Sequence, residues 1–167
     1  MARFAEGQLT VWAAIQMVHR HRRFIAQHVG LPEEQVRVIA PADVGGGFGT
    51  KGQWYPEDIL VPLLAMRLGR PVKWIEDRRE HTVASWVERE QVHTLEVAAR
   101  RDGTLVALRD SFLHELGAYT ASGLNLPQNT MIHSVSAYRI PHVDLHMRGV
   151  LTNTTPVGAY RGAGRPQ

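Results

Sequence analysis

A cluster of glycines is the first place in this sequence where a ligand could be held. Residues 45–49 are Gly-Gly-Gly-Phe-Gly, and Gly52 follows closely. Glycine adopts positive φ without strain and lets a ligand approach the main chain. The exposed backbone N–H groups of such a loop suit a phosphate or another anion. The cluster therefore predicts an anion-binding loop, with a glycine-rich structural turn as the alternative interpretation.

Two phosphate-binding patterns can be tested against this cluster. The P-loop pattern fails on both sides of Lys51, which lacks the glycine before it and the hydroxyl residue after it. The dinucleotide pattern G-x-G-x-x-G is met literally between Gly47 and Gly52, with the acidic pair Glu76-Asp77 at about the expected distance. The next helix is expected to begin only at Pro56, and the preceding loop is long. A dinucleotide-binding domain is therefore a secondary hypothesis.

Arginines near the end of the sequence form a second candidate site. Arg161 and Arg165 alternate with glycines in the segment AYRGAGRPQ. Guanidinium groups in a flexible loop can hold an anion or an oxo group. A frayed terminus is the alternative interpretation.

The nine histidines and a basic run are further candidates for a site. No H-E-x-x-H or comparable metal-ligand spacing occurs among the nine histidines, so we expect no metal held directly by the protein. The basic run Arg20–Phe24 lies on the polar side of an expected helix. A solvated helix face is the favoured interpretation of this run, and an electrostatic or subunit contact is the alternative.

Hydrophobic periodicity predicts the elements that must position these residues. Helices are expected at 17–29 and 56–68, because Gly30 and Gly69 provide stop signals. Pro62 should kink or shorten the second helix. Asp102-Gly103 predicts a hairpin turn. Gly117–Ala137 should be loop with some helix, and the C-terminal residues should be loop. Expected strands lie at 9–15, 36–39, 71–75, 93–99, 105–115 and 143–147.

Composition narrows the class of protein. The sequence has 167 residues, with 44% hydrophobic and 21% charged residues, a net charge of +3 and no cysteine. These values are typical of a soluble globular protein, and they exclude disulfides, cysteine-ligated zinc and a thiol nucleophile. We expect a cytoplasmic protein without a membrane span and without a nucleic-acid partner. The element order predicts an α/β (mixed α+β) fold, in which a mixed sheet with flanking helices precedes a β-hairpin-rich second half.

Five segments together resemble one family. LTVWAAIQ, VRVIAPADVGGGFGTK, LGRPVKWIEDRREH, YRIPHVDL and TNTTPVGAYRGAGRPQ follow one another in the order found in the molybdenum hydroxylases. These are the large, molybdopterin-binding subunits of the xanthine dehydrogenase, aldehyde oxidase and carbon monoxide dehydrogenase superfamily. The resemblance covers essentially the whole chain.

The resemblance implies a molybdenum–molybdopterin cofactor and a set of contact residues. Gln16 is similar to the glutamine that hydrogen-bonds the apical oxygen of molybdenum. The glycine cluster is similar to the loop against the pterin, and the arginine loop to the one beneath the metal. The implied cofactor-binding residues are Gln16, Gly46, Gly47, Phe48, Gly49, Tyr160, Arg161 and Gly162.

Departures from the family narrow the substrate. Carbon monoxide dehydrogenases carry a cysteine at the position of Gly162, so copper-dependent oxidation of carbon monoxide is not expected. Purine hydroxylases have an aromatic residue at the position of Ala163, a glutamate near Gly52 and an arginine near Asn129, and this sequence has none of them. Small aldehydes or nitrogen heterocycles are the expected substrates.

The resemblance also implies that the chain is incomplete. The family's general-base glutamate lies far downstream, so we assign no catalytic residue and expect residues 1–167 to be inactive alone. We interpret them as a single partial domain, from an engineered fragment or a split or degraded gene. A non-catalytic remnant or assembly module is the alternative. The expected partners are the remainder of the large subunit, an FAD-binding medium subunit, an iron–sulfur small subunit and a small-molecule substrate.

Overall fold

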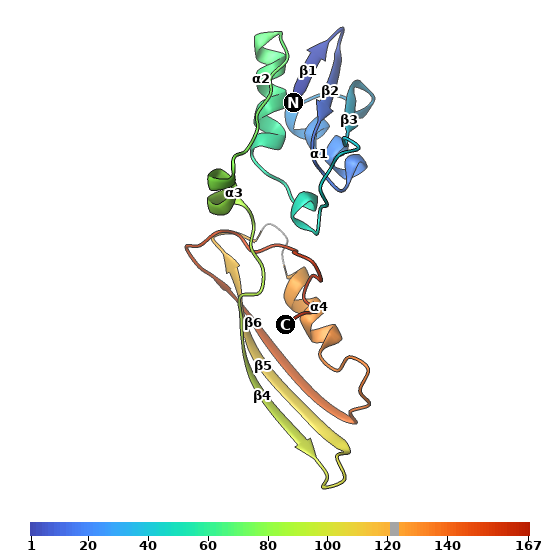
Figure 1. Cartoon of the computed structure of the whole chain (residues 1–167), viewed down its shortest axis with the longest axis vertical. Helices are drawn as coiled ribbons and strands as arrows, with labels where there is room; N and C mark the ends of the chain where they lie inside the picture. The colour runs from blue at the N-terminus through green and yellow to red at the C-terminus, as the bar shows by residue number, and fades with distance from the viewer. Residues whose placement is uncertain (121–123) are drawn as a thin grey trace. The chain divides into compact units, whose positions relative to one another are not determined.

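The chain folds as two compact units, Met1–Val83 and Ala84–Gln167, in a computed structural model that describes residues 1–120 and 124–167 (Figure 1). Each unit has one mixed three-stranded sheet with at least one helix beside it. The predicted α/β class with mixed sheets is therefore confirmed. The interpretation of residues 1–167 as one partial domain stays a prediction.

The sheet of the first unit combines a hairpin with a parallel pair. β1 (Ala2–Ala5) and β2 (Gln8–Trp12) are antiparallel, and β3 (Val36–Ile39) runs parallel to β2. Glu6 and Gly7 join the hairpin with φ values of 52° and 75°, which suits the twist of a two-residue turn. β2 ends at Trp12, earlier than the predicted strand 9–15. β1 was not predicted, because four residues with one arginine carry little periodic signal.

Two helices cover this sheet, and both confirm their predicted ends. α1 spans Val18–Val29 and α2 spans Glu57–Leu68. Gly30 and Gly69 follow them with left-handed φ values of 74° and 61°, as expected for glycine C-caps. α2 continues through Pro62, so the helix is not shortened there, and the alternative expectation of a kink stays a prediction. Proline removes one helical N–H there, and its side chain is fully buried.

Both helices contribute to one hydrophobic core. Ile25 and Ala26 of α1 meet Val61 and Ala65 of α2, and they pack with residues of all three strands. The other buried members of the core are Ala2, Leu9, Val11 and Val36.

His21 corrects the prediction that the basic run Arg20–Phe24 is a solvated face. Its side chain is fully buried, and its ring lies 4.5 Å from the ring of Trp54. Its Nε2 lies 3.7 Å from Oδ2 of Asp58. A tryptophan just before α2 therefore covers a face of α1 that sequence polarity assigned to solvent.

The segment after α2 also differs from its prediction. Residues 71–75 form only an isolated bridge, between Val72 and Ala2, and no strand. A short helix that was not predicted, α3 (Arg78–Ala84), follows. Asp77 Oδ1 accepts from the Glu80 N–H at 2.8 Å, and Glu80 Oε2 accepts from the Asp77 N–H at 2.9 Å. This reciprocal pair is a capping box, and the D-x-x-E spacing was the signal that could have found α3.

The second unit contains the predicted hairpin and a crossover. β4 (Gln91–Ala99) and β5 (Leu105–Gly117) are antiparallel around the Asp102-Gly103 turn, as predicted. β6 (His142–Leu151) runs parallel to β5, and α4 (Asn125–His133) lies in the connection between them. The expected loop with some helix thus contains α4, and its residues 121–123 lie outside the described residues.

Polar side chains lie among the buried residues beneath α4. Alternate residues of β5 are buried, from Leu108 to Leu116. Within this face His93 Nδ1 lies 2.9 Å from Asp110, and His93 Nε2 lies 2.9 Å from Gln91 Oε1. The Gln91 amide then donates to His114 Nδ1 at 2.9 Å. These bonds satisfy groups that would be costly to bury alone.

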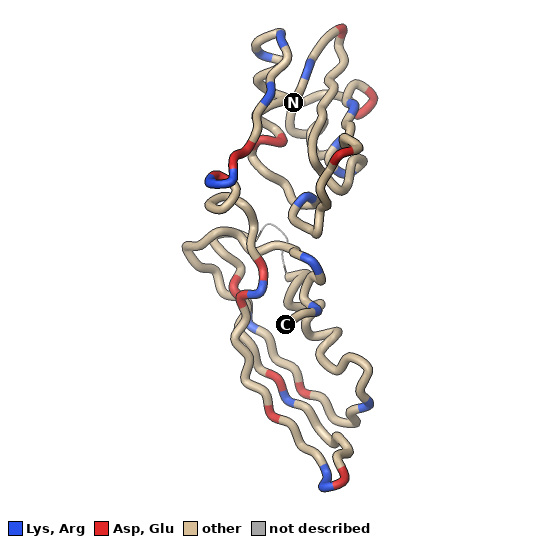
Figure 2. Tube along the Cα trace, in the orientation of Figure 1, with Lys and Arg blue, Asp and Glu red and all other residues tan. Residues whose placement is uncertain are grey.

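Charge is distributed over both units. Figure 2 shows basic and acidic residues interspersed along each unit. This distribution agrees with the small net charge of +3. Among the described residues, no helix has the length and apolar character needed to cross a bilayer.

Candidate cofactor-binding site

Gln16 and the glycine cluster meet in the first unit. The Gln16 backbone N–H donates to the Lys51 carbonyl at 2.9 Å, which ties the chain after β2 to the end of the cluster. The Gly49 N–H then donates to Oε1 of the Gln16 side chain at 2.7 Å. Two segments separated by 33 positions therefore share one side-chain bond.

Gly47 makes this contact possible. A Cβ atom at this position would lie 2.2 Å from Gln16 Cγ and 2.5 Å from Gln16 Oε1. Contacts this short do not occur, so any other residue would displace the glutamine side chain. The φ angle of Gly47 is not in the left-handed region, and the requirement for glycine here is one of space.

Phe48 folds back over Gly46. A Cβ on Gly46 would lie 2.4 Å from Cε2 of the Phe48 ring, and the φ of Gly46 is 88°. Phe48 itself has a φ of 53°, uncommon for a non-glycine residue, and its side chain is half-exposed. The loop thus presents an aromatic ring and a glycine backbone at the surface of the first unit.

The orientation of the Gln16 amide follows from its bond to Gly49. A backbone N–H needs an acceptor, so the oxygen Oε1 faces Gly49 and the NH₂ group faces away. Within residues 1–120 and 124–167, this NH₂ group donates no hydrogen bond. Gln16 is exposed, and its amide is therefore held as an outward-facing donor.

The other predicted residues lie in the second unit. Tyr160, Arg161 and Gly162 belong to a loop after β6, and both side chains of the pair Tyr160-Arg161 are exposed. Four consecutive residues, from Arg161 to Gly164, have positive φ values of 41°, 119°, 50° and 92°. The loop is ordered by contacts with Glu88, Arg89 and Asn129, which sequence reasoning missed.

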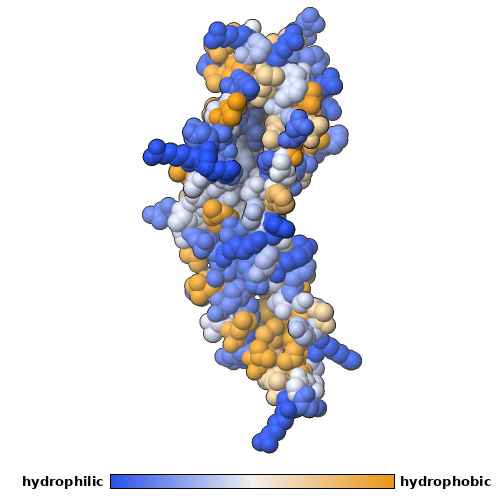
Figure 3. Space-filling view, viewed as in Figure 1, coloured by the Kyte–Doolittle hydropathy of each residue, from blue (hydrophilic) through white to orange (hydrophobic). Residues whose placement is uncertain are grey.

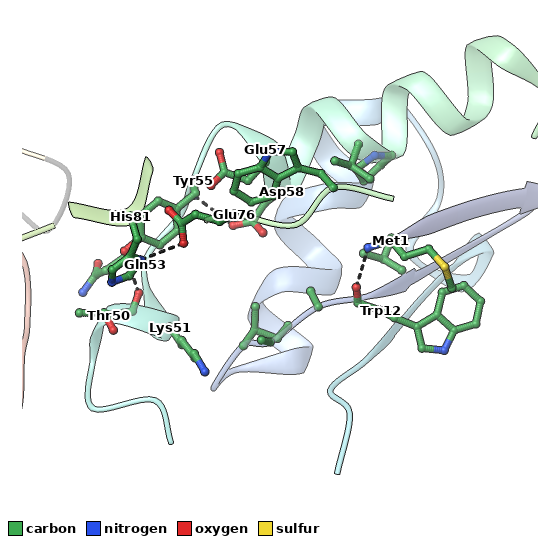
Figure 4. Close-up of a pocket in the computed structure, with 17 residues that line it drawn as sticks. Met1, Trp12, Thr50, Lys51, Gln53, Tyr55, Glu57, Asp58, Glu76 and His81 are labelled. Atoms are coloured by element: carbon green, nitrogen blue, oxygen red, sulfur yellow. Dashed lines mark hydrogen bonds and ion pairs between the residues drawn. The ribbon is translucent and has the colours of Figure 1, made fainter. Parts of the chain in front are cut away.

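A separate cavity of about 310 Å³ lies in the first unit (Figure 4). Its wall includes Ile15 and Thr50, which flank the contact described above. Gln16 and the residues of the glycine cluster are not among its lining residues. The predicted cofactor contacts of the first unit, Gln16 and residues 46–49, therefore lie outside this cavity.

Three carboxylates, Glu57, Asp58 and Glu76, line the cavity, and two of them bond to other groups of the first unit. Glu76 pairs with His81 at 2.8 Å, and Asp58 accepts from the Tyr55 N–H at 3.0 Å. Burial raises the pKa of Asp58, while the Tyr55 hydrogen bond and His21 oppose this shift. Burial likewise raises the pKa of Glu57. Asp58 thus bonds to the segment before α2 and lies near His21 of α1, whereas Glu76 pairs with His81 of α3.

The alternative hypotheses find little support in this geometry. Gly52 lies in a single 3₁₀ turn, Thr50–Gly52, and α2 begins five positions later, so the glycine pattern does not open a helix as a dinucleotide site requires. Glu76 follows no strand and bonds to His81. Across the described part of the chain, no group of three or more His, Asp or Glu side chains could hold a metal ion.

Comparison with known proteins identifies the family. The molybdopterin cofactor-binding domain family matches residues 1–167, the whole sequence. The chain belongs to this family. The family match includes both units and every residue that the sequence predicted as a cofactor contact.

Relatives share this part of a much longer chain. The chain is 40% identical over 162 residues to the 6-hydroxypseudooxynicotine dehydrogenase complex subunit gamma of Paenarthrobacter nicotinovorans, covering 96% of this chain and 20% of that protein. It is 37% identical over 159 residues to the carbon monoxide dehydrogenase large chain of Afipia carboxidovorans, covering 93% and 20% respectively. The chain thus spans about a fifth of the length of these curated relatives.

A solved structure agrees with the fold. Quinoline 2-oxidoreductase from Pseudomonas putida 86 superposes with a TM-score of 0.92 and 36% sequence identity. The superposition covers 98% of this chain and 21% of that chain. Both units therefore have the backbone of a molybdopterin cofactor-binding domain.

Proposed function

We propose that this chain is the part of a molybdenum hydroxylase large subunit that supplies loops in contact with the molybdopterin cofactor. The contact residues are those that the resemblance implies: Gln16 and residues 46–49 in the first unit, and residues 160–162 in the second. The observation that carries the proposal is the bond from the Gly49 N–H to Gln16 Oε1 at 2.7 Å. This bond orients the Gln16 amide as a donor and holds it beside the glycine loop on the surface of the first unit.

The residues present fit such a group. The outward NH₂ of Gln16 can donate to an oxo or phosphate oxygen, and the missing Cβ atoms of Gly46 and Gly47 make room for the Phe48 ring and the Gln16 side chain that would face the group. Arg161 is an always-charged donor suited to the same oxygens. Family members hold the metal through the pterin, so the lack of cysteine in this sequence is compatible with the proposal.

The chain's own residues would bind and orient, and they would not transfer protons to substrate. When bound, the molybdenum–molybdopterin cofactor supplies the redox and oxygen-transfer chemistry. Gln16 would hold one oxygen of the group, and the Phe48 ring would exclude water beside it. No general base is assigned within residues 1–167, because the resemblance implies that the family's glutamate lies downstream of the segment that matches this chain.

The proposed substrates are nitrogen heterocycles or small aldehydes. Quinoline, named in the matched oxidoreductase, is a nitrogen heterocycle. Copper-dependent carbon monoxide oxidation is not proposed, although a carbon monoxide dehydrogenase large chain is 37% identical, because Gly162 stands where that chemistry would need cysteine.

The proposed partners complete the enzyme. The remainder of the large subunit would cover both units, and an FAD-binding subunit and an iron–sulfur subunit would carry electrons away. The relative from Paenarthrobacter nicotinovorans is named as one subunit of a complex, which supports a multi-subunit assembly. We place the assembly in the cytoplasm.

The test of this function is retention of cofactor by the chain. The 167-residue chain, produced in a host that makes molybdopterin, should co-purify with pterin, measured by fluorescence after oxidation, and with molybdenum, measured by mass spectrometry. Gly47→Ala should lower the retained pterin about tenfold, the loss expected when one charge-assisted or buried hydrogen bond is removed. Its Cβ would displace the flexible Gln16 side chain without forcing the backbone.

Gly45→Ala is the matched control. Gly45 lies in the same loop, has no left-handed φ, and has open space where a Cβ would be added. The control should retain pterin as the natural chain does, and both variants should unfold at the same denaturant concentration. Equal pterin in the natural chain and in Gly47→Ala would contradict the proposed role of Gln16 and Gly47.

A further inference from the structure

A buried carboxylate joins the two ends of the Arg161 loop. The Glu88 side chain is 0% exposed. Its Oε2 accepts from the Tyr160 N–H at 2.8 Å, and its Oε1 accepts from the Gly164 N–H at 3.1 Å. Tyr160 and Gly164 lie more than 70 positions after Glu88 in the sequence. One side chain therefore fixes the distance between the first and last residues of the loop.

Arg89 adds a second set of bonds from the neighbouring position. Its Nη1 donates to Glu88 Oε2 at 2.9 Å, and its Nη2 donates to the carbonyls of Tyr160 and Arg161 at 2.9 and 2.7 Å. Its guanidinium carbon also lies 5.9 Å from the centre of the Tyr160 ring. The planar fork of an arginine can make these bonds together, whereas a single ammonium group cannot.

The loop needs such support because its backbone is strained. Arg161 and Ala163 have φ values of 41° and 50°, a region that residues with a Cβ avoid. Strained residues persist only where the surrounding structure over-determines them, and they cluster at functional sites. The bonds from Glu88 and Arg89 end at Tyr160, Arg161 and Gly164, on both sides of the strained pair.

We propose that Glu88 and Arg89 are positioning residues that hold the Tyr160–Gly164 loop in the conformation that presents Arg161. The hydrogen bonds described above between the pair and the loop end at backbone atoms of the loop, and Arg89 also lies over the Tyr160 ring, so the pair would act on a ligand through the loop. The functional meaning of this inference rests on the proposed cofactor contacts of Tyr160, Arg161 and Gly162. The conformational part does not depend on a ligand and can be tested on the cofactor-free chain.

The first measurement is amide exchange of the loop in the free chain. Arg89→Lys keeps the positive charge but loses the fork, and the exchange of the Tyr160 and Gly164 amides, followed by NMR, should become about tenfold faster. The amides of β5 and the unfolding midpoint should not change, which separates positioning from general stability. Arg101→Lys, at an exposed position of the β4–β5 turn, is the matched control and should change nothing.

A second pair of variants tests the carboxylate. Glu88→Gln keeps the shape of the side chain but replaces one acceptor oxygen with a donor, so it should speed the same two amides. Glu90→Gln makes the same change at an exposed side chain two positions away and should leave both amides unaffected. Unchanged loop exchange in both Arg89→Lys and Glu88→Gln would overturn the proposal.

The second measurement links the loop to the cofactor. Release of pterin from the loaded chain should be about tenfold faster in Arg89→Lys than in Arg101→Lys, if one hydrogen bond from the loop is lost. Faster exchange of the Tyr160 and Gly164 amides with unchanged release of pterin would overturn the positioning role. Glu88 and Arg89 would then only stabilise the loop. A natural chain that retains no pterin would contradict the proposed function. Amide exchange would still decide whether Glu88 and Arg89 hold the Tyr160–Gly164 loop.

Discussion

His114 shows how a single buried residue couples the fold to pH. It lies on the covered face of β5, is fully buried, and accepts a hydrogen bond from Gln91 through Nδ1. No hydrogen-bond partner of its Nε2 is found in the described structure. Burial lowers the pKa of His114, and the carboxylate of Glu115 opposes the shift only partly. The second unit therefore favours the neutral ring.

We predict that acid destabilises the second unit partly through His114. In the unfolded chain this histidine takes up a proton near the ordinary pKa of about 6.5. The folded pKa is lower, so as pH falls below that value the unfolded state binds the proton first and the free energy of unfolding decreases. The slope for one proton is at most about 1.4 kcal/mol per pH unit. Denaturant unfolding followed between pH 7.5 and pH 5 measures it.

His114→Asn should reduce this pH dependence. An asparagine oxygen can still accept from Gln91, but the side chain no longer titrates. The control is His142→Asn, at an exposed position at the start of β6, which should keep the slope of the natural chain. A slope that is the same in the natural chain and in His114→Asn would show that other groups cause the acid sensitivity.

At the scale of elements, α2 exposes more apolar surface than a helix of an isolated unit normally does. Val61, Pro62 and Ala65 are buried, yet the helix also carries four exposed leucines. Apolar side chains gather over this helix in Figure 3. The exposed leucines are Leu60, Leu63, Leu64 and Leu68. A helix that is apolar all round is normally buried. We therefore expect the remainder of the proposed large subunit to cover the exposed leucines of α2.

We predict that the chain alone self-associates through α2. Replacing Leu60 and Leu64 together by glutamine should weaken association about tenfold, because each leucine loses part of the roughly 1.5–3 kcal/mol that its full burial would contribute. Light scattering coupled to size-exclusion chromatography measures the change. Ile132→Gln, on α4 of the second unit, removes an exposed aliphatic side chain elsewhere and serves as the control. Association that responds equally to both changes would contradict a role for α2.

At the scale of the whole molecule, the two units carry the proposed contacts separately. The first unit supplies an oriented amide and a glycine loop, and the second supplies a strained arginine loop held by Glu88 and Arg89. Neither unit contains an assigned general base. The chain spans about a fifth of the length of its curated relatives, and we propose that the remainder of the large subunit supplies the general base.

The isolated chain should therefore bind but not turn over. We expect no hydroxylation of quinoline or of a small aldehyde by the cofactor-loaded chain, measured as reduction of an artificial electron acceptor. An intact member of the family, assayed in parallel, is the positive control. Turnover that follows the amount of loaded chain would refute the expectation and would place a proton acceptor within residues 1–167.

The family, the order of most elements and the glycine loop could be predicted from the sequence. Their signals are local: the period of apolar residues predicts α1, the Asp102-Gly103 pair predicts the β4–β5 turn, and Gly30 predicts a helix end. Residues 71–75 were predicted wrongly as a strand because an apolar run is equally compatible with an extended segment that pairs at one residue only. α3 was missed although its capping box was present.

The amino-acid sequence by itself determined where the chain can turn, which helices form and that Gly47 and Arg161 belong to a known family pattern. Tertiary structure alone decided that Gln16 faces Gly49, that Glu88 and Arg89 hold the arginine loop, and that His21 is buried. Each of these contacts joins residues far apart in the chain. Their energy depends on which surfaces folding brings together, and no periodicity within one segment records that choice.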